Sequence, residues 1–162
     1  MDRPVDDPVP LHPECQPLAF LLGTWRGEGR GEYSTIEPFR YGEEVRFSHT
    51  GRPFLAYVQR TWRLPGGEPL HGEVGYWRPK PGSRIELVLA HSSGIAEVAE
   101  GTIDGTTIAV ASTSLGVAAT AEETTTLERR FESEADLLRY ELRMAAVGQP
   151  LGRHLVAELR RV

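Results

Sequence analysis

One stretch, Gly23–Tyr33, constrains the fold more than any other part of the chain. Successive side chains of a strand point to opposite faces, so one face of this stretch is polar or charged. The other face begins with Trp25, ends with Tyr33 and carries only glycine between them. Glycines in a strand usually mark strong curvature or the close approach of a backbone or ligand. Such a strand favours a barrel around a cavity, and the alternative is a bent strand in a filled sandwich.

Alternation of apolar and polar residues continues along most of the remaining chain, in segments separated by short turns rich in glycine and proline. The spacing predicts nine or ten strands and leaves no stretch long enough for a crossover helix, which excludes a parallel sheet. We therefore expect an all-β, antiparallel up-and-down barrel, because closure removes exposed sheet edges. The candidate strands are 23–33, 39–49, 54–62, 70–78, 84–91, 95–103, 107–114, 124–131, 137–144 and 154–162.

The N-terminal segment differs in composition from the rest of the chain. Residues 1–17 contain five prolines and three aspartates, which predicts an extended arm. The apolar run Leu18–Leu22 follows a proline and stops at Gly23, which predicts a short helix over one end of the barrel. At a total length of 162 residues, residues 18–162 are expected to form one domain.

Composition excludes several function classes. The formal charge is -5 and no run of Lys and Arg occurs, so a nucleic-acid partner is not expected. No apolar run approaches the roughly 20 residues of a membrane span, and the acidic, proline-rich start does not resemble a signal peptide. The single cysteine, Cys15, excludes an internal disulfide. We expect a soluble cytoplasmic protein without a membrane partner.

Histidine and glutamate carry the remaining candidate chemistry. The five histidines show no pair at zinc-site spacing, and the chain has neither a Cys-x-x-Cys motif nor a serine-nucleophile elbow. Glu43 shares a strand face with Phe39 and Phe47, so we expect it either buried with a partner or near a barrel rim. A structural ion pair with an arginine is favoured.

His154 is the histidine whose position matters most, because it opens the last candidate strand at a barrel end. A neutral imidazole there could ligate a haem iron while a carbonyl or carboxylate holds its other nitrogen. The alternative is a surface histidine. Strand parity groups His154 with Val156 rather than with Leu155, so it would face outward unless a bulge near Arg153 resets the register.

A series of short motifs runs along the chain in a fixed order. It begins with Gly-x-Trp-x-Gly-x-Gly at residues 23–29 and continues through Tyr33-Ser34-Thr35-Ile36, Phe39-x-Tyr41-x-Glu43-Glu44, Gly51-x-Pro53, His71-x-Glu73-x-Gly75-Tyr76, Gly94-Ile95-x-Glu97-Val98, Leu138-x-Tyr140, Met144-Ala145 and His154-Leu155-x-Ala157. In this ordered series the chain resembles the nitrobindins, a family of small haem proteins, over about residues 18–161.

The resemblance implies a ten-stranded barrel, similar to lipocalins and fatty-acid-binding proteins, that holds haem b at one open end. The family's axial iron ligand falls on His154, and its haem-contacting threonine falls on Thr35, although Ser34 stands where proline is usual. It further implies a peroxynitrite isomerase with ferric haem that converts peroxynitrite to nitrate, binds nitric oxide, detoxifies reactive nitrogen species and forms a homodimer. No catalytic side chain is implied beyond the haem iron.

Two expectations remain from the residues themselves. Parity predicts that Phe39, Tyr41, Leu89 and His91 line the cavity, with His91 either a distal acid or a rim residue. A lipocalin-like carrier of a fatty acid or other small apolar ligand, without redox chemistry, is the alternative function, because the glycine-faced strand only makes room. A carrier would tolerate the loss of His154, whereas a haem protein would lose its iron ligand.

Overall fold

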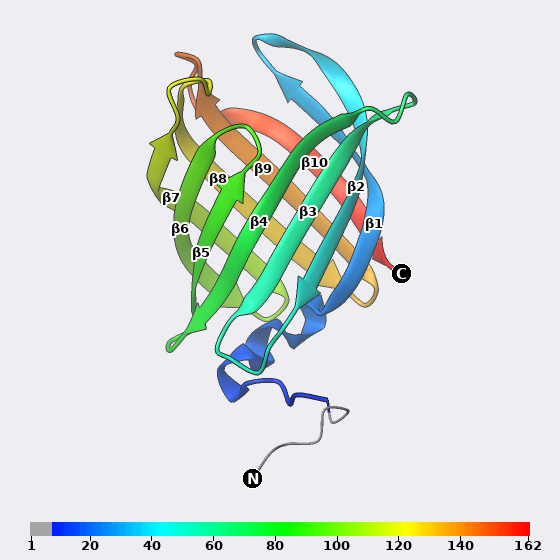
Figure 1. Ribbon diagram of the computed structural model, residues 1–162, viewed down its shortest axis with the longest axis vertical. Coiled ribbons are helices and arrows are strands. Elements are labelled where there is room, and N and C mark those ends of the chain that lie inside the picture. Colours follow the sequence, from blue (N-terminus) through cyan, green and yellow to red (C-terminus); the bar gives the residue numbers. More distant parts are fainter. Residues whose placement is uncertain (1–7) are drawn as a thin grey trace.

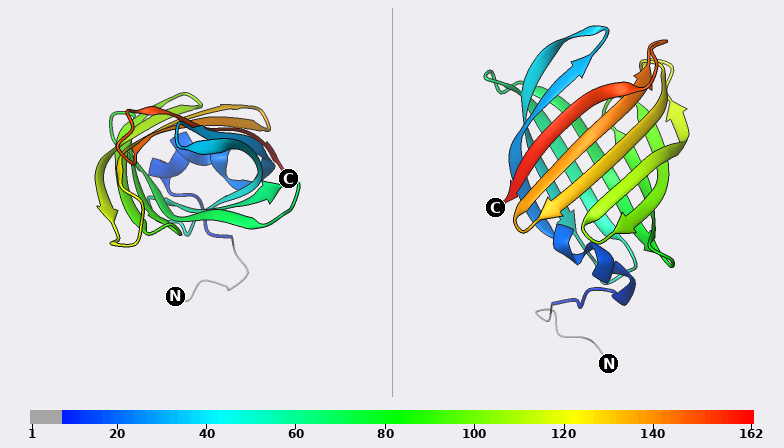
Figure 2. Two further views of the ribbon diagram at one scale, coloured as in Figure 1. Left: turned by 90° about the horizontal axis from the view of Figure 1, so that it is seen from above. Right: turned by 180° about the vertical axis from the view of Figure 1, so that it is seen from behind.

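The alternating segments form a closed antiparallel barrel (Figures 1 and 2). The computed structural model describes residues 8–162, and within that range ten strands follow the order β1-β10-β9-β8-β7-β6-β5-β4-β3-β2. Each strand pairs with its neighbours in sequence, and β1 closes against β10, which confirms the predicted ten-stranded up-and-down barrel. The strands are β1 (Gly23–Tyr33), β2 (Ile36–Ser48), β3 (Leu55–Leu64), β4 (Pro69–Lys80), β5 (Arg84–His91), β6 (Ile95–Asp104), β7 (Thr107–Val117), β8 (Thr124–Glu134), β9 (Leu137–Ala146) and β10 (Gly152–Arg161).

A 3₁₀-helix, η1 (Pro13–Leu21), lies across the lower end of the barrel in Figure 1. It begins five residues before the predicted Leu18, so the expectation of an extended chain is wrong for residues 13–17. The reason is local: Pro13 suits the first helical position, the His12 side chain accepts a hydrogen bond from the backbone N–H of Glu14, and Cys15 is buried. Residues 1–7 of the predicted arm lie outside the described residues, and the division of the chain at residue 17 stays a prediction.

Trp25 and Arg161 fasten η1 to the barrel. The buried indole of Trp25 donates a 2.8 Å hydrogen bond to the carbonyl of Leu21. The guanidinium of Arg161 lies 4.2 Å from the centroid of the Trp25 ring and donates hydrogen bonds to the carbonyls of Phe20 and Leu22. This end of the barrel is therefore closed by packing and by hydrogen bonds to the last turn of the helix.

The glycine face of β1 is covered by side chains and a neighbouring backbone rather than left empty. A Cβ on Gly27 would lie 1.9 Å from the backbone oxygen of Glu158, on the paired strand β10. A Cβ on Gly29 would lie 2.3 Å from the Tyr41 ring, and one on Gly31 would lie 2.2 Å from the Phe39 ring. The glycines thus permit the close approach of the β10 backbone to Gly27 and of the Tyr41 and Phe39 rings to Gly29 and Gly31.

The barrel interior divides along its axis. The half near η1 is filled by an aromatic and aliphatic core, in which the Phe47 and Phe131 rings each lie 4.9 Å from the Trp77 ring. The opposite half is open. None of the residues placed in the structure forms a helix with the length and apolar character of a membrane span.

Candidate functional site

A cavity of about 520 Å³ occupies the barrel end opposite η1. Its lining includes the two predicted site residues, Thr35 and His154, and three of the four residues expected from parity, Phe39, Tyr41 and His91. The fourth, Leu89, lies in the buried core instead. The cavity predicted from the glycine-faced strand therefore exists.

A β-bulge directs His154 toward this cavity. Arg153 pairs with Arg143 of β9 and Leu155 pairs with Leu142, so His154 is an extra residue in β10. The bulge resets the alternation, and both His154 and Leu155 line the cavity. Simple parity would have turned His154 outward, and the bulge near Arg153 is the feature that reverses this.

The imidazole of His154 is held in one orientation. Its Nδ1 lies 3.1 Å from the backbone oxygen of Glu32, and its ring meets the edge of Tyr33 with centroids 5.8 Å apart. A carbonyl only accepts, so Nδ1 carries the proton and Nε2 of the neutral ring keeps a free lone pair. Burial lowers the pKa of His154 below its ordinary 6.5, against the opposing effect of the Glu32 hydrogen bond. The site thus presents a neutral nitrogen donor to the cavity.

Thr35 lies in the exposed turn between β1 and β2, at the cavity rim. Its neighbour Ser34 donates a 3.1 Å hydrogen bond to the side-chain oxygen of Gln149, in the loop that precedes β10. This hydrogen bond links the turn that carries Thr35 to the loop that leads to His154. Tyr33 adds a second link, because its hydroxyl accepts a 2.9 Å hydrogen bond from the backbone N–H of Ala146.

A buried charged cluster lies at the base of the cavity. The guanidinium of Arg129 donates to Glu73 at 3.1 and 3.2 Å and to Glu97 at 2.8 and 3.2 Å. Burial works against ionisation of both carboxyls, but the charge of Arg129 and the contacts with neighbouring histidines together exceed this effect, so the pKa of each carboxyl lies below its ordinary value. His91 Nε2 lies 2.9 Å from Glu97 Oε2, which places His91 at the base of the cavity rather than at its rim. Sequence reasoning missed this cluster, although Arg129 has the inward parity of its strand.

Glu43 is hydrogen-bonded to uncharged side chains instead of forming the expected ion pair. The Tyr140 hydroxyl donates to Glu43 at 2.6 Å and the Gln59 amide donates at 3.1 Å, while Tyr41 and Tyr140 are joined by a 2.8 Å hydrogen bond. Burial raises the pKa of Glu43 from 4.5 to about 7. Glu43 is therefore buried with partners, as one of the two alternatives predicted. The favoured arginine partner is wrong, because Arg129 is already engaged by two other carboxylates.

Comparison with known proteins agrees with this arrangement. Residues 14–161 match the family described as "THAP4-like, heme-binding beta-barrel domain". The chain is 54% identical over 159 residues to "Peroxynitrite isomerase 2" of Mycobacterium ulcerans, covering 95% of this chain and 98% of that protein. It is 47% identical over 161 residues to "Peroxynitrite isomerase Rv2717c" of Arabidopsis thaliana, covering 98% and 95%.

A solved structure extends the likeness to three dimensions. The crystal structure of Rv2717c from M. tuberculosis superposes with a TM-score of 0.89 at 48% identity, covering 94% of this chain and 99% of that one. The cavity, the strand order and the sequence match are all consistent with one family. The chain belongs to the nitrobindin family of haem-binding β-barrels.

Proposed function

We propose that this protein binds haem b in the cavity, isomerises peroxynitrite to nitrate and binds nitric oxide. One observation carries the proposal: the bulge in β10 turns His154 into the cavity with Nε2 free and Nδ1 held by the Glu32 carbonyl. A metal-ligating histidine usually has such a partner on its other nitrogen, which fixes both the tautomer and the ring plane. The names of the relatives at about 50% identity support the same activity.

The residues of the cavity fit a haem. His154 would ligate the iron through Nε2, and Thr35 would contact the macrocycle from the β1–β2 turn. Apolar side chains from several strands, among them Phe39, Met144 and Leu155, would cover the ring and exclude water from one side. When bound, the haem supplies a ferric iron with an open coordination position, a Lewis acid for an anionic oxygen ligand. The protein's part would be to ligate, orient and shield it, and we expect no further catalytic side chain among residues 8–162.

Titration with hemin tests the proposal, with His154→Ala as the critical variant and His49→Ala as a matched control outside the cavity lining. We expect a sharp Soret band in the wild type and in His49→Ala, and a displaced or lost band in His154→Ala. Peroxynitrite decay and nitrate yield should follow the Soret band across the three proteins. If His154→Ala takes up hemin like the wild type, the ligation proposal fails, and a screen with fatty acids would then examine a carrier function.

We further propose that two copies of the chain associate through the outer face of β3–β6. Exposed apolar residues lie on neighbouring strands there, since Val58 pairs with Val74 and Tyr76 pairs with Val88, which in turn pairs with Val98. Contiguous exposed apolar side chains are typical of an interaction surface. Light scattering should report a dimer for the wild type and a monomer for Val74→Lys, and an unchanged mass in Val74→Lys would refute this surface.

A cytoplasmic location and the lack of nucleic-acid and membrane partners stay predictions.

A further inference from the structure

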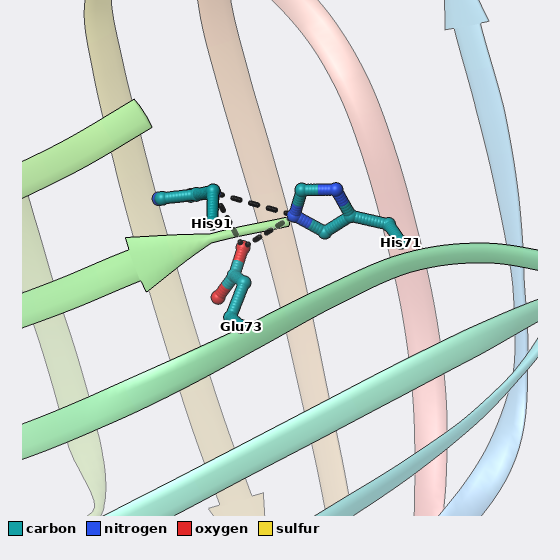
Figure 3. Close-up of side chains that lie close together, drawn as sticks. All are labelled: His71, Glu73 and His91. Carbon is teal, nitrogen blue, oxygen red and sulfur yellow. Dashed lines mark hydrogen bonds and ion pairs between the residues drawn. The ribbon is translucent and has the colours of Figure 1, made fainter. Parts of the chain in front are cut away.

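Three side chains of the cavity wall bring their donor atoms together at one point (Figure 3). His71 and Glu73 come from β4, and His91 ends the paired strand β5. His71 Nε2 lies 3.2 Å from His91 Nδ1, and each of these nitrogens lies 3.4 Å from Glu73 Oε1. The three atoms therefore form a nearly equilateral triangle whose edges are too long for three strong hydrogen bonds.

The size of the triangle suits a metal ion. Zinc binds histidine nitrogen and carboxylate oxygen at about 2.0–2.2 Å, and tetrahedral angles then separate the ligand atoms by about 3.3–3.5 Å. The edges of 3.2, 3.4 and 3.4 Å lie at or just below this range before any adjustment of the side chains. An ion there would have three protein ligands, and since all three residues line the cavity, its fourth position would face the cavity.

Neighbouring hydrogen bonds fix the tautomer of His91 and the orientation of Glu73, so that both present a lone pair to the triangle. His91 Nε2 lies 2.9 Å from Glu97 Oε2, and an ionised carboxylate only accepts, so Nε2 carries the proton and Nδ1 turns its lone pair into the triangle. Glu73 is fixed by Arg129 at one side and by the Tyr57 hydroxyl at 3.2 Å. A carboxylate that orients a ligating histidine is the usual outer shell of a zinc site.

The charge of the side chains beside the triangle also favours a bound cation. The side chains of Glu73 and Glu97 are 4% and 0% exposed, and both contact the single guanidinium of Arg129. Two buried carboxylates against one guanidinium leave a negative charge beside the triangle, and buried charge without compensation is costly. A divalent cation in the triangle would offset this charge and leave a net charge of +1.

We propose that His71, Glu73 and His91 bind one divalent transition-metal ion of the zinc class, with Glu97 orienting His91. Two imidazoles and one carboxylate suit zinc or ferrous iron rather than magnesium or calcium, which prefer oxygen ligands. The ligand set does not include His154 and the proposal does not rest on haem binding, although both sites face the same cavity. An ion with an open position on the cavity would also offer an anionic ligand an electropositive contact.

Metal titration of the haem-free chain, prepared without a histidine tag, tests this site. Co²⁺ is the spectroscopic probe and Zn²⁺ the calorimetric one, and we expect one ion per chain with visible d–d bands from Co²⁺. His71→Gln and Glu73→Gln should weaken binding by more than the about 10–100-fold that loss of an outer-shell partner costs, and Glu97→Gln should cost about 10–100-fold. Because His71 is 31% exposed at the side chain, His71→Gln is the variant least able to disturb folding.

Two controls separate the site from haem ligation and from general histidine content. His154→Ala and His49→Ala should bind Co²⁺ and Zn²⁺ like the wild type. Circular dichroism and thermal unfolding establish that each variant is folded. The proposal is overturned if the wild type takes up neither ion stoichiometrically, or if His71→Gln binds both as the wild type does; the triangle would then be a hydrogen-bonded network.

Discussion

Glu43 provides the sharpest test of the energetics of the barrel interior. Its side chain is fully buried among neutral partners, Tyr140 and Gln59, and the charged groups that shift its pKa are Glu73 and Arg129. Glu43→Gln keeps the shape and mimics the protonated acid, because the amide oxygen can accept from Gln59 and the NH₂ group can donate to Tyr140. The substitution therefore removes the ionisable group and little else.

The size of the effect follows from the pKa of Glu43, which burial raises from 4.5 to about 7. Below pH 4.5 the carboxyl is protonated in both folded and unfolded chains, so its titration does not affect stability. As the pH rises from 4.5 to 7, the unfolded chain loses this proton while the folded chain keeps it, which favours unfolding. At about 1.36 kcal/mol per pH unit, the wild type should lose about 3 kcal/mol relative to Glu43→Gln.

Urea unfolding at pH 4.5 and pH 8 measures this difference. The free energy of unfolding of Glu43→Gln, minus that of the wild type, should rise by about 3 kcal/mol between the two conditions. Other titrating groups cancel because they are common to both proteins. A difference that stays constant with pH would refute the reasoning, since it would mean that Glu43 ionises as easily in the barrel as in the unfolded chain.

Three further predictions concern stability and are checked by urea unfolding. Gly27→Ala should lower the free energy of unfolding by about 1–3 kcal/mol, because its Cβ would strike a backbone oxygen, whereas Gly116→Ala, with its nearest contact at 3.7 Å, should change it little. Arg129→Met should cost about 3–5 kcal/mol at pH 7 by leaving two buried carboxylates without their partner, and less at pH 4, where carboxylates take up protons. Trp25→Phe should cost about 1 kcal/mol through the lost hydrogen bond to Leu21. Equal stability of Gly27→Ala and Gly116→Ala, a pH-independent Arg129→Met penalty, or a neutral Trp25→Phe would each contradict the structure.

The barrel was predictable from the sequence because its cause is local. Alternation with a period of two marks every strand that has one face in the core, and short turns join strands that are adjacent in space. The start of η1 was not predictable in the same way. A proline-rich segment favours an extended chain. The helix from Pro13 depends in addition on the His12 cap and on the burial of Cys15, and neither follows from composition.

The glycine face of β1 shows where a correct conclusion rested on an incomplete reason. Missing side chains on one strand predicted space inside the barrel, and the cavity is present. The space next to Gly29 and Gly31, however, is taken by the rings of Tyr41 and Phe39 from β2. Which neighbour fills a gap depends on the register between strands, and that register is a property of the folded sheet.

Arg129 and His154 show the limit of prediction from strand alternation. Arg129 faces inward by simple alternation, so a charged residue on an apolar face was visible, but its partners lie 56 and 32 residues away and meet it only when the barrel closes. His154 is the opposite case, since alternation turns it outward and a single extra residue in β10 turns it back. Parity therefore finds the residues that hold the interior together and fails at bulges, which tend to lie next to functional sites. In this chain the family motif His154-Leu155-x-Ala157 singled out His154 as a cavity residue, whereas strand periodicity alone placed it on the outer face.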